Sequence, residues 1–357
     1  MTTHLLLVGG FLGAGKTTLL LQAARRLTGQ GYRVGLVTND QGQGLVDTAL
    51  AQQQGIPVTE VAGGCFCCRF PDLLASIHQL QQVAAPEVIL AEPVGSCTDL
   101  AATVLRPLQA YYPAQFQLAP LTIVLDSQRE VATFPATVDY LYRKQLAEAE
   151  VIAFNKSDLL DPVTLSKKLR ELQQIYPQAR VMSLSARTGA GLAEWLELAL
   201  RQSSRIVPAL DLDYATYAEA EACLGWLNAK GALMASRPFA PAAWLSQTLT
   251  SLEQALTAQG AAIAHLKLHL TTPTAALKAS LTQSGSPIFW DLQPADIETG
   301  QAEFILNARV NTDPHTLETI VRQVVPEVKP QPDLRCQFTQ FECFSPLPPK
   351  PTYRLLV

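Results

Sequence analysis

Residues 10–17 say more about the fold than any other segment of the chain. They read G-F-L-G-A-G-K-T and match the pattern G-x-x-x-x-G-K-[ST] in full. They follow the apolar run 5–8 and open an amphipathic stretch at 17–27, so they lie between a predicted strand and a predicted helix. That context is typical of a phosphate-binding loop, whose glycines let backbone N–H groups surround an anion at a helix N-terminus. A nucleotide site in an α/β fold is therefore expected.

The residues predicted to contact the phosphates belong to this loop and the first helical turn: Gly10, Gly13, Ala14, Gly15, Lys16, Thr17 and Thr18. We expect Lys16 to bridge the β- and γ-phosphates and the Thr17 hydroxyl to ligate Mg²⁺. The alternative is a glycine-rich turn with an incidental lysine, and the full pattern in this context argues against it.

From residue 4 to about 203, short apolar runs alternate with amphipathic stretches. The candidate strands are 5–8, 34–38, 58–61, 88–91, 121–125, 151–154 and 181–184. They lack polar alternation, as strands covered on both faces do. The helical patterns among them are 17–27, 72–83, 162–175 and 192–202. This order predicts that residues 1–205 form a mostly parallel sheet flanked by helices, the fold of a P-loop NTPase.

Residues 206–357 have a different pattern and are expected to form a smaller α+β domain with an antiparallel sheet. Its candidate strands are 224–233, 264–270 and 304–310, and its candidate helices are 241–259 and 314–324. Within 264–270 apolar and polar residues alternate, which predicts that His265 and His269 lie on a solvated face. From Pro326 the chain is rich in proline and is expected to run extended over the surface.

Composition excludes several classes of protein. The 357 residues carry 27 basic and 31 acidic side chains, a net charge of -4, which disfavours sequence-independent binding to nucleic acid. No apolar run approaches the ~18 residues of a membrane-spanning helix, and the start of the chain lacks the basic region of a signal peptide. Three closely spaced cysteines fit a reducing compartment. We therefore expect a soluble cytoplasmic protein that binds neither nucleic acid nor membrane.

A second group of motifs concerns the base of the nucleotide. The run 151–154 ends in N-K-S-D at 155–158. The Asp158 carboxylate would accept hydrogen bonds from N1–H and the exocyclic amine of guanine, whereas adenine has the wrong polarity. Asn155 would meet the N7 edge, and the stem of Lys156 would cover the ring. Taken alone, the segment is explained as well by a turn followed by a helix cap.

A second signal follows one strand later, at 185–189. The segment S-A-R-T-G resembles the S-A-K loop in which a backbone N–H contacts the guanine oxygen, so Ser185 and Ala186 are further candidate nucleotide-binding residues. Together with the phosphate loop, this favours GTP over ATP.

Three cysteines lie within four residues, in the segment G-G-C-F-C-C at 63–68. Thiolates are soft ligands, so Cys65, Cys67 and Cys68 can converge on one transition-metal ion. A redox pair of Cys65 and Cys68, or simple packing of small apolar side chains, are the alternatives. Three sulfurs leave one tetrahedral position open, which suits an exchangeable ion better than a structural one. Cys97 is left without an assignment.

Two acidic residues follow predicted strands, where parallel sheets place their ligands. Glu92 begins E-P-V-G, an acidic-x-x-Gly element that would sense the γ-phosphate and Mg²⁺. Asp40 would orient water or help to ligate a metal, although a turn explains it equally well. We predict Lys16, Asp40 and Glu92 as catalytic residues, and Thr17 and Glu92 as magnesium ligands.

The phosphate loop, the cysteine segment 63–68, E-P-V-G at 92–95 and N-K-S-D at 155–158, in this order and spacing, resemble the CobW-type GTPases, relatives of the HypB and UreG metallocentre-assembly proteins. The resemblance covers about residues 4–200. It implies GTP binding, slow hydrolysis, a zinc or cobalt ion at the three cysteines, and delivery of that ion to a client metalloprotein. The chain departs from the family in having N-D-Q-G at 39–42 where N-E-F-G is usual, and in lacking a histidine-rich run.

These features predict a GTP-driven metallochaperone in which nucleotide changes how tightly the metal is held. A nucleotide-dependent homodimer is a further expectation. We see no obvious arginine finger, and Gln41 and Gln43 are the candidates for positioning water, so hydrolysis is expected to be slow. The alternatives are a regulatory GTPase switch with a zinc-sensing or structural cysteine site, and an ATP-using small-molecule kinase.

Overall fold

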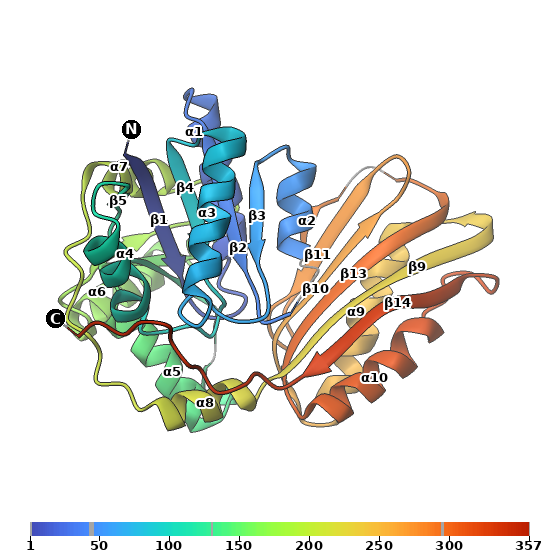
Figure 1. The fold of residues 1–357 in the computed structure, drawn as a ribbon. Helices are drawn as coiled ribbons and strands as arrows, with labels where there is room; N and C mark the ends of the chain where they lie inside the picture. The colour runs from blue at the N-terminus through green and yellow to red at the C-terminus, as the bar shows by residue number, and fades with distance from the viewer. Residues whose placement is uncertain (1, 43–45, 130, 294–295, 357) are drawn as a thin grey trace.

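The computed structural model describes residues 2–42, 46–129, 131–293 and 296–356. Within these ranges the chain forms a parallel sheet covered by helices and, beside it, an antiparallel sheet with helices on its far face (Figure 1). None of the helices in the described ranges is both long and apolar enough to cross a membrane.

The first sheet has the strand order β3-β2-β4-β1-β6-β7-β8, with β5 paired to β1, and its strand pairs are parallel. Its strands are β1 (Thr3–Gly9), β2 (Val34–Asn39), β3 (Val58–Val61), β4 (Val88–Glu92), β5 (Phe116–Leu118), β6 (Thr122–Asp126), β7 (Val151–Asn155) and β8 (Arg180–Ser183). Its helices are α1 (Lys16–Gly29), α2 (Val46–Gln53), α3 (Phe70–Ala84), α4 (Arg106–Tyr111), α5 (Ala136–Ala147), α6 (Pro162–Ile175) and α7 (Leu192–Arg201). The predicted parallel fold is confirmed.

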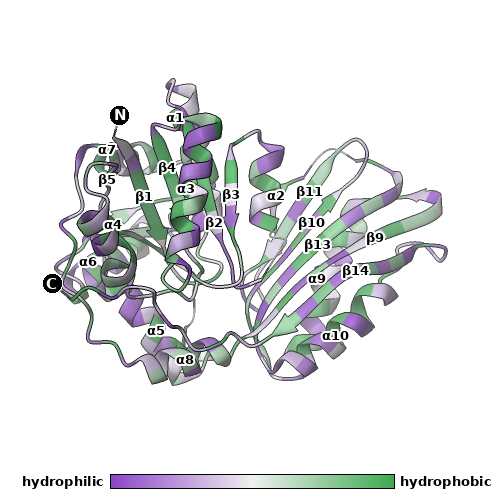
Figure 2. Ribbon diagram, in the orientation of Figure 1, coloured by the Kyte–Doolittle hydropathy of each residue, from purple (hydrophilic) through white to green (hydrophobic). Residues whose placement is uncertain are grey.

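The strands lack polar alternation because both faces of this sheet are covered. Leu5 and Leu7 of β1 pack into one core, and Leu6 and Val8 pack into another on the opposite face. Successive side chains of a strand point to opposite faces, so each face needs its own apolar set. Figure 2 shows β1 and β4 as hydrophobic along most of their length, with polar positions on the outer sides of the helices.

The second sheet has the order β12-β11-β10-β13-β9-β14 and is antiparallel. Its elements are β9 (Gly225–Phe239), α9 (Pro241–Ala258), β10 (Ala262–Thr271), β11 (Ala276–Leu281), β12 (Phe289–Leu292), β13 (Thr299–Asn311), α10 (Pro314–Glu327) and β14 (Arg335–Phe344). Its apolar face packs against α9 and α10 in a third core.

The predicted solvated face of β10 is wrong. His265 and His269 are only 5% and 3% exposed, because the polar face of this strand rests on the first domain. Gln53 of α2 lies 3.4 Å from the ring of His269. Burial lowers the pKa of His265, and it lowers the pKa of His269 to about 4, so both rings are neutral at pH 7.

The predicted extended tail from Pro326 is only partly correct. Helix α10 continues through Pro326 to Glu327, and β14 then joins the second sheet beside β9. Beyond β14, residues 345–356 run outside any helix or strand, as predicted for the tail, and they return across the first domain as the red trace in Figure 1. The domain boundary at residue 205 stays a prediction, since helix α8 (Tyr214–Ala222) lies beyond it yet buries Tyr217 in the core of the first domain.

Candidate functional site

The loop between β1 and α1 has the backbone shape that the motif predicts. Gly10, Gly13 and Gly15 have φ angles of 130°, 75° and 95°, a region that residues with a Cβ rarely adopt. A Cβ on Gly10 would also collide with the carbonyl oxygen of Val124. Lys16 folds back over the loop, where its Nζ donates to the carbonyl oxygen of Gly10 at 2.8 Å. Burial lowers the pKa of Lys16.

The two predicted magnesium ligands lie in contact at the foot of this loop. The Thr17 hydroxyl donates to Glu92 Oε1 at 3.0 Å. The second carboxylate oxygen, Glu92 Oε2, is buried and has no hydrogen-bond partner among the described residues. Burial and the nearby Asp47 raise the pKa of Glu92. Hydroxyl and carboxylate oxygens are the hard donors that Mg²⁺ prefers, so these residues fit that ion.

Asn155, which is predicted to meet the base, lies between two loops of the pocket. Its amide nitrogen donates to the carbonyl oxygen of Ala14 at 2.8 Å, and its amide oxygen accepts from the backbone N–H of Ala186 at 2.8 Å. The side chain therefore ties the phosphate loop to the 185–189 loop at the wall of the nucleotide pocket. The predicted contacts of Asn155 and Ala186 with a guanine base stay predictions.

Lys156 and Asp158 of the N-K-S-D segment line the pocket with their partners. Asp158 accepts from the Ser185 hydroxyl at 2.5 Å and forms an ion pair with Arg187. Lys156 reaches Asp126 at 2.6 Å and lies 3.3 Å from the Thr282 hydroxyl of the second domain. Hydrogen bonds from Ser185 and Arg187 outweigh burial and lower the pKa of Asp158. A carboxylate held ionised at this edge is suited to accept N–H donors.

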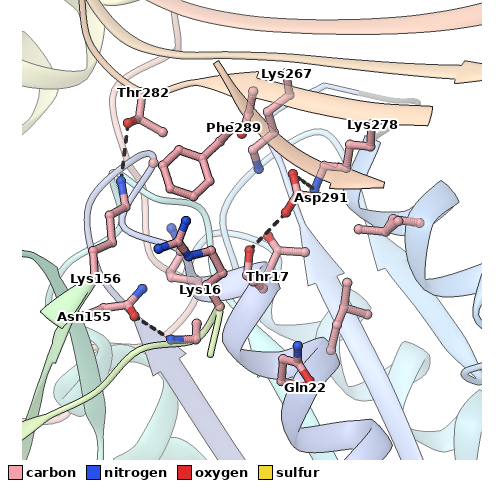
Figure 3. Close-up of a pocket in the computed structure, with 18 of the residues that line it drawn as sticks. Lys16, Thr17, Gln22, Asn155, Lys156, Lys267, Lys278, Thr282, Phe289 and Asp291 are labelled. Carbon is pink, nitrogen blue, oxygen red and sulfur yellow. Dashed lines mark hydrogen bonds and ion pairs between the residues drawn. The ribbon is translucent and has the colours of Figure 1, made fainter. Parts of the chain in front are cut away.

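One pocket brings most of the predicted nucleotide-binding residues together. Its floor carries these members of the phosphate and base motifs: Gly13, Gly15, Lys16, Thr17, Thr18, Glu92, Asn155, Lys156, Asp158 and Ala186. Its opposite wall comes from the second domain and carries these residues: His265, Lys267, Lys278, Ser280, Thr282, Phe289, Trp290 and Asp291. Figure 3 shows both walls, with Lys267 and Lys278 above Lys16 and Thr17. The sequence pattern did not predict this second wall, although the lysine between two histidines on β10 was visible.

Asp40 does not line this pocket. Its carboxylate accepts from Arg309 Nη2 at 2.7 and 2.8 Å, and Arg309 is itself fully buried over the ring of Trp226. In this arrangement the Asp40 carboxylate joins the two domains, and its predicted catalytic role stays a prediction. Of the two glutamines proposed to position water, Gln41 lies beside the cysteine segment, and Gln43 falls outside the described residues.

The three cysteines of the 63–68 segment converge as predicted. Cys65 Sγ lies 2.7 Å from Cys67 Sγ and 3.3 Å from Cys68 Sγ, and the last two sulfurs are 3.7 Å apart. All three ligand atoms lie within 4.8 Å of one another. In a tetrahedral zinc site with Zn–S bonds of about 2.3 Å, sulfurs lie roughly 3.8 Å apart. A modest adjustment would therefore admit an ion.

A fourth sulfur belongs to this cluster, and the sequence pattern did not identify it. Cys97 is buried, and its Sγ lies 3.8 Å from Cys67 Sγ. Hydrogen bonds from Cys65 and Cys67 lower the pKa of Cys97 to about 6, while bonding to Cys65 raises the pKa of Cys68 to about 11. One thiolate stabilised by neighbouring thiols is a favourable starting point for soft-metal binding.

Asn39, at the end of β2, connects the cysteine segment to the segment that follows Glu92. Its amide nitrogen donates to the carbonyl oxygens of Val61 and Gly64 at 2.8 and 2.7 Å. Its amide oxygen accepts from the backbone N–H of Phe66 at 2.9 Å and from that of Val94 at 3.4 Å. The two segments therefore share one buried side chain.

Comparison with known proteins supports the nucleotide-binding domain. The family model described as "CobW/HypB/UreG, nucleotide-binding domain" matches residues 4–183, about half of the chain. The zinc chaperone YeiR of Escherichia coli is 30% identical over 170 residues, which is 47% of this chain and 51% of YeiR. The zinc chaperone CobW of Pseudomonas aeruginosa is 28% identical over 205 residues, 48% of this chain and 54% of that protein. The chain thus spans about half the length of the curated relatives it matches.

Two solved structures are also similar. The Zn(II)-bound YjiA GTPase from E. coli has a TM-score of 0.37 and 12% identity over 91% of this chain and 99% of that one. HypB from Helicobacter pylori in complex with nickel has a TM-score of 0.41 and 17% identity, covering 56% of this chain and 86% of that one. TM-scores this low carry no argument about function.

Proposed function

Because the chain belongs to the CobW/HypB/UreG family of nucleotide-binding proteins, we propose that it is a GTP-hydrolysing metallochaperone. It binds a divalent transition metal at Cys65, Cys67 and Cys68 and delivers that ion to a client protein. Zinc is the favoured metal, since two curated relatives are zinc chaperones and the donor set is soft. Cobalt is the second choice. Because the thiols must stay reduced to bind an ion, we assign this activity to the cytoplasm.

The observation that carries the proposal is the short connection between the two candidate sites. Glu92 contacts Thr17 in the nucleotide pocket, and the backbone of Val94, two residues later, is bonded to Asn39. The same Asn39 holds the cysteine segment at Gly64 and Phe66. A shift of the 92–95 segment on nucleotide binding would therefore reach the sulfurs through one side chain. This is the coupling that a nucleotide-dependent metal carrier requires.

In this proposal each part of the pocket has a distinct task. Lys16 moves from the Gly10 carbonyl to the phosphates, and Asp158 accepts from the guanine N–H groups. Mg²⁺, held by Thr17 and Glu92, would neutralise charge on the terminal phosphates. Hydrolysis is expected to be slow, because Asp40 is engaged by Arg309.

The test is a set of zinc titrations of the full chain with a non-hydrolysable GTP analogue, with GDP and without nucleotide. The proposal expects an affinity that differs by about tenfold or more between nucleotide states, which corresponds to roughly 1.4 kcal/mol of coupling. Cys67→Ser should abolish stoichiometric binding, while Cys223→Ser, outside the cluster, serves as the control. Equal zinc affinity in all three nucleotide states would contradict the proposal.

The fourth sulfur favours a second candidate, a regulatory GTPase switch with a closed zinc site. If Cys97 completes a four-sulfur site, the ion is structural or sensed rather than passed on. Transfer distinguishes the two candidates. A chaperone releases zinc to a competing chelator faster in one nucleotide state, whereas a closed site releases it slowly in every state. A client protein and a nucleotide-dependent homodimer remain further parts of the leading proposal.

A further inference from the structure

Two lysines of the second domain project into the nucleotide pocket. Lys267 on β10 pairs with Ser280, and Lys278 on the neighbouring strand β11 pairs with His269. Both lysines line the wall that faces the phosphate loop (Figure 3). The side chain of Lys278 is 3% exposed and that of Lys267 is 16% exposed. Two ammonium groups are thus withdrawn from water opposite Lys16, in a pocket that already holds one buried cation. Burial of this kind is costly unless an anion shares the site.

The anions that the described residues supply to these lysines are limited. Asp47, in the first turn of α2, forms an ion pair with Lys267, and its other oxygen lies 3.6 Å from Lys278 Nζ. Asp291 on β12 lies 3.5 Å from Lys278, and it also accepts from the Thr18 hydroxyl at 3.4 Å. One aspartate of the first domain therefore holds two lysines of the second. Asp47 Oδ1 has no hydrogen-bond partner among the described residues, so its ion pair with Lys278 is the looser of the two.

The base end of the pocket is closed by the same wall. The ring of Phe289 on β12 lies 5.4 Å from the Arg187 guanidinium carbon and 6.0 Å from Lys156 Nζ. Thr282 contacts Lys156. The second sheet thus covers both motifs that the first domain contributes, the phosphate loop and the N-K-S-D segment. A nucleotide in this pocket would be enclosed between the two domains.

We propose that Lys267 and Lys278 bind the terminal phosphate of GTP, and that Asp47 occupies them when no triphosphate is present. This inference rests on the proposed guanine-nucleotide function. A γ-phosphate brings more negative charge than one carboxylate and offers several oxygens, so it can engage both ammonium groups at once. The lysines would also supply positive charge where an arginine finger acts in other GTPases, although here it comes from the second domain of the same chain.

The proposal gives the triphosphate a way to move α2. When the phosphate takes over Lys267 and Lys278, Asp47 loses these ion pairs. The first turn of α2 then loses its ionic contacts with the second sheet, while the bond from the Val46 N–H to Asn307 Oδ1 remains. Burial alone would raise the pKa of Asp47, but the two lysines outweigh it and hold that pKa well below its usual range. Asp47 is therefore an ionised competitor across the physiological range of pH. GDP lacks the terminal phosphate and would leave the Asp47 contacts in place.

The experiment measures binding of GTPγS and of GDP to the full chain by calorimetry in the presence of Mg²⁺. Lys267→Met and Lys278→Met should each lower the affinity for GTPγS about ten- to hundredfold, as expected for a lost charge-assisted contact. The affinity for GDP should fall by less than about threefold. Lys267→Arg should stay near the wild type. Lys329→Met, an exposed lysine beside Glu327, is the matched control and should bind both nucleotides normally.

Asp47→Asn separates phosphate binding from a purely structural ion pair. Removal of the competing carboxylate should raise the affinity for GTPγS and leave the affinity for GDP unchanged. If the ion pair only stabilises the fold, this variant should bind both nucleotides less well. Methionine variants that bind GTPγS like the wild type, or lose GTPγS and GDP equally, would overturn the inference. If a methionine variant does not fold, Asp47→Asn decides the matter. A wild-type chain that binds neither nucleotide would instead overturn the proposed function.

Discussion

At the scale of single residues, buried asparagine side chains connect loops that no backbone hydrogen-bond ladder connects. Asn39 makes four bonds to three different segments, and Asn155 makes two to the loops on either side of the pocket. An amide carries donors and an acceptor on one rigid group, so it can bind an N–H of one loop and a carbonyl of another. Both asparagines lie at the carboxyl ends of parallel strands, where the loops of such a sheet converge.

Asn39→Ala tests the connection between the two sites. The substitution leaves buried backbone groups at Gly64 and Phe66 unpaired, so we expect the free energy of unfolding to fall by about 1–3 kcal/mol. If the amide transmits the nucleotide state, zinc affinity should also become the same with GTP analogue and with GDP. Urea denaturation and zinc titration measure the two effects. Asn311→Ala, whose amide contacts only Cys223 among its described partners, is the control. Retained nucleotide dependence would show that the coupling runs elsewhere.

Asp158→Asn tests the base pocket. The carboxylate accepts from Ser185, which is buried, and from Arg187, which is exposed at the pocket and can yield to guanine. An amide in its place presents a donor to N1–H, so GTP should bind about ten- to hundredfold more weakly, while xanthosine triphosphate should bind better than to the wild type. Competition binding with the two nucleotides gives the ratio. An unchanged preference for GTP would contradict the assignment of Asp158.

At the scale of elements, local patterns predicted the parallel sheet well and the second domain less well. The apolar runs of β1, β4, β6 and β7 are continuous, and this pattern predicts strands that are covered on both faces. β14 was missed because its residues alternate weakly and follow a proline-rich stretch, and its place is decided by pairing with β9, about a hundred residues earlier in the chain. A register shift between Phe338 and Gln340 also interrupts the alternation of apolar residues along β14.

The same reason explains the errors in the site. The phosphate loop is a local motif, so its residues and its position before α1 could be predicted from spacing alone. The face of β10 that carries His265 and Lys267 alternates like a solvated face, and only the docking of the first domain makes it buried. Likewise, nothing near Asp40 in the chain indicates that Arg309 would reach it. Cys97 reaches the cysteine cluster only through the packing of the β4 loop beside the β3 loop.

One element gives the stability a defined dependence on pH. Glu148, at the end of α5, is buried and binds the Thr98 hydroxyl and the backbone N–H of Ala101, each at 3.1 Å. Burial raises its pKa from 4.5 to about 8 in the folded chain. The folded chain therefore holds a proton that the unfolded chain loses above pH 4.5. The stabilisation is complete below that pH and is lost as the pH rises through about 8.

The expected contribution of Glu148 is a decrease in the free energy of unfolding between about pH 5 and 8, with a slope of at most about 1.4 kcal/mol per pH unit. In Glu148→Gln the slope should be smaller, although Glu221, whose burial also raises its pKa to about 8, keeps part of it. Urea denaturation of both proteins at several pH values measures the slopes. Equal slopes in the two proteins would show that Glu148 is ionised in the folded chain.

At the scale of the whole molecule, parts of the second half of the chain cover both candidate sites. The sheet of the second domain covers the nucleotide pocket, and the terminal segment 345–356 crosses the cysteine cluster. In that segment the backbone N–H of Lys350 donates to Cys68 Sγ at 3.2 Å, and that of Thr352 donates to the Cys67 carbonyl at 2.8 Å. A cavity of about 840 Å³ opens beside Cys65 and Cys68, between this segment and β14. Access to the sulfurs therefore depends on how the chain end is held.

Arg354 is the charged anchor of that segment, beside the backbone bond of Leu355 to Ala102, and it can be replaced without a change in the cluster itself. Arg354 Nε donates to Asp99 Oδ2 at 2.7 Å, and its Nη2 donates to the carbonyl oxygen of Leu210 at 2.9 Å. In Arg354→Ala the segment loses its charged anchor, so it should leave Cys68 more often, and the reaction of that thiol with an aromatic disulfide reagent should accelerate about three- to tenfold. Arg201→Ala, which removes an exposed i,i+4 ion pair on α7, should react at the wild-type rate. If the two variants react equally fast, the segment does not control the cluster, and the metal must enter by the cavity alone.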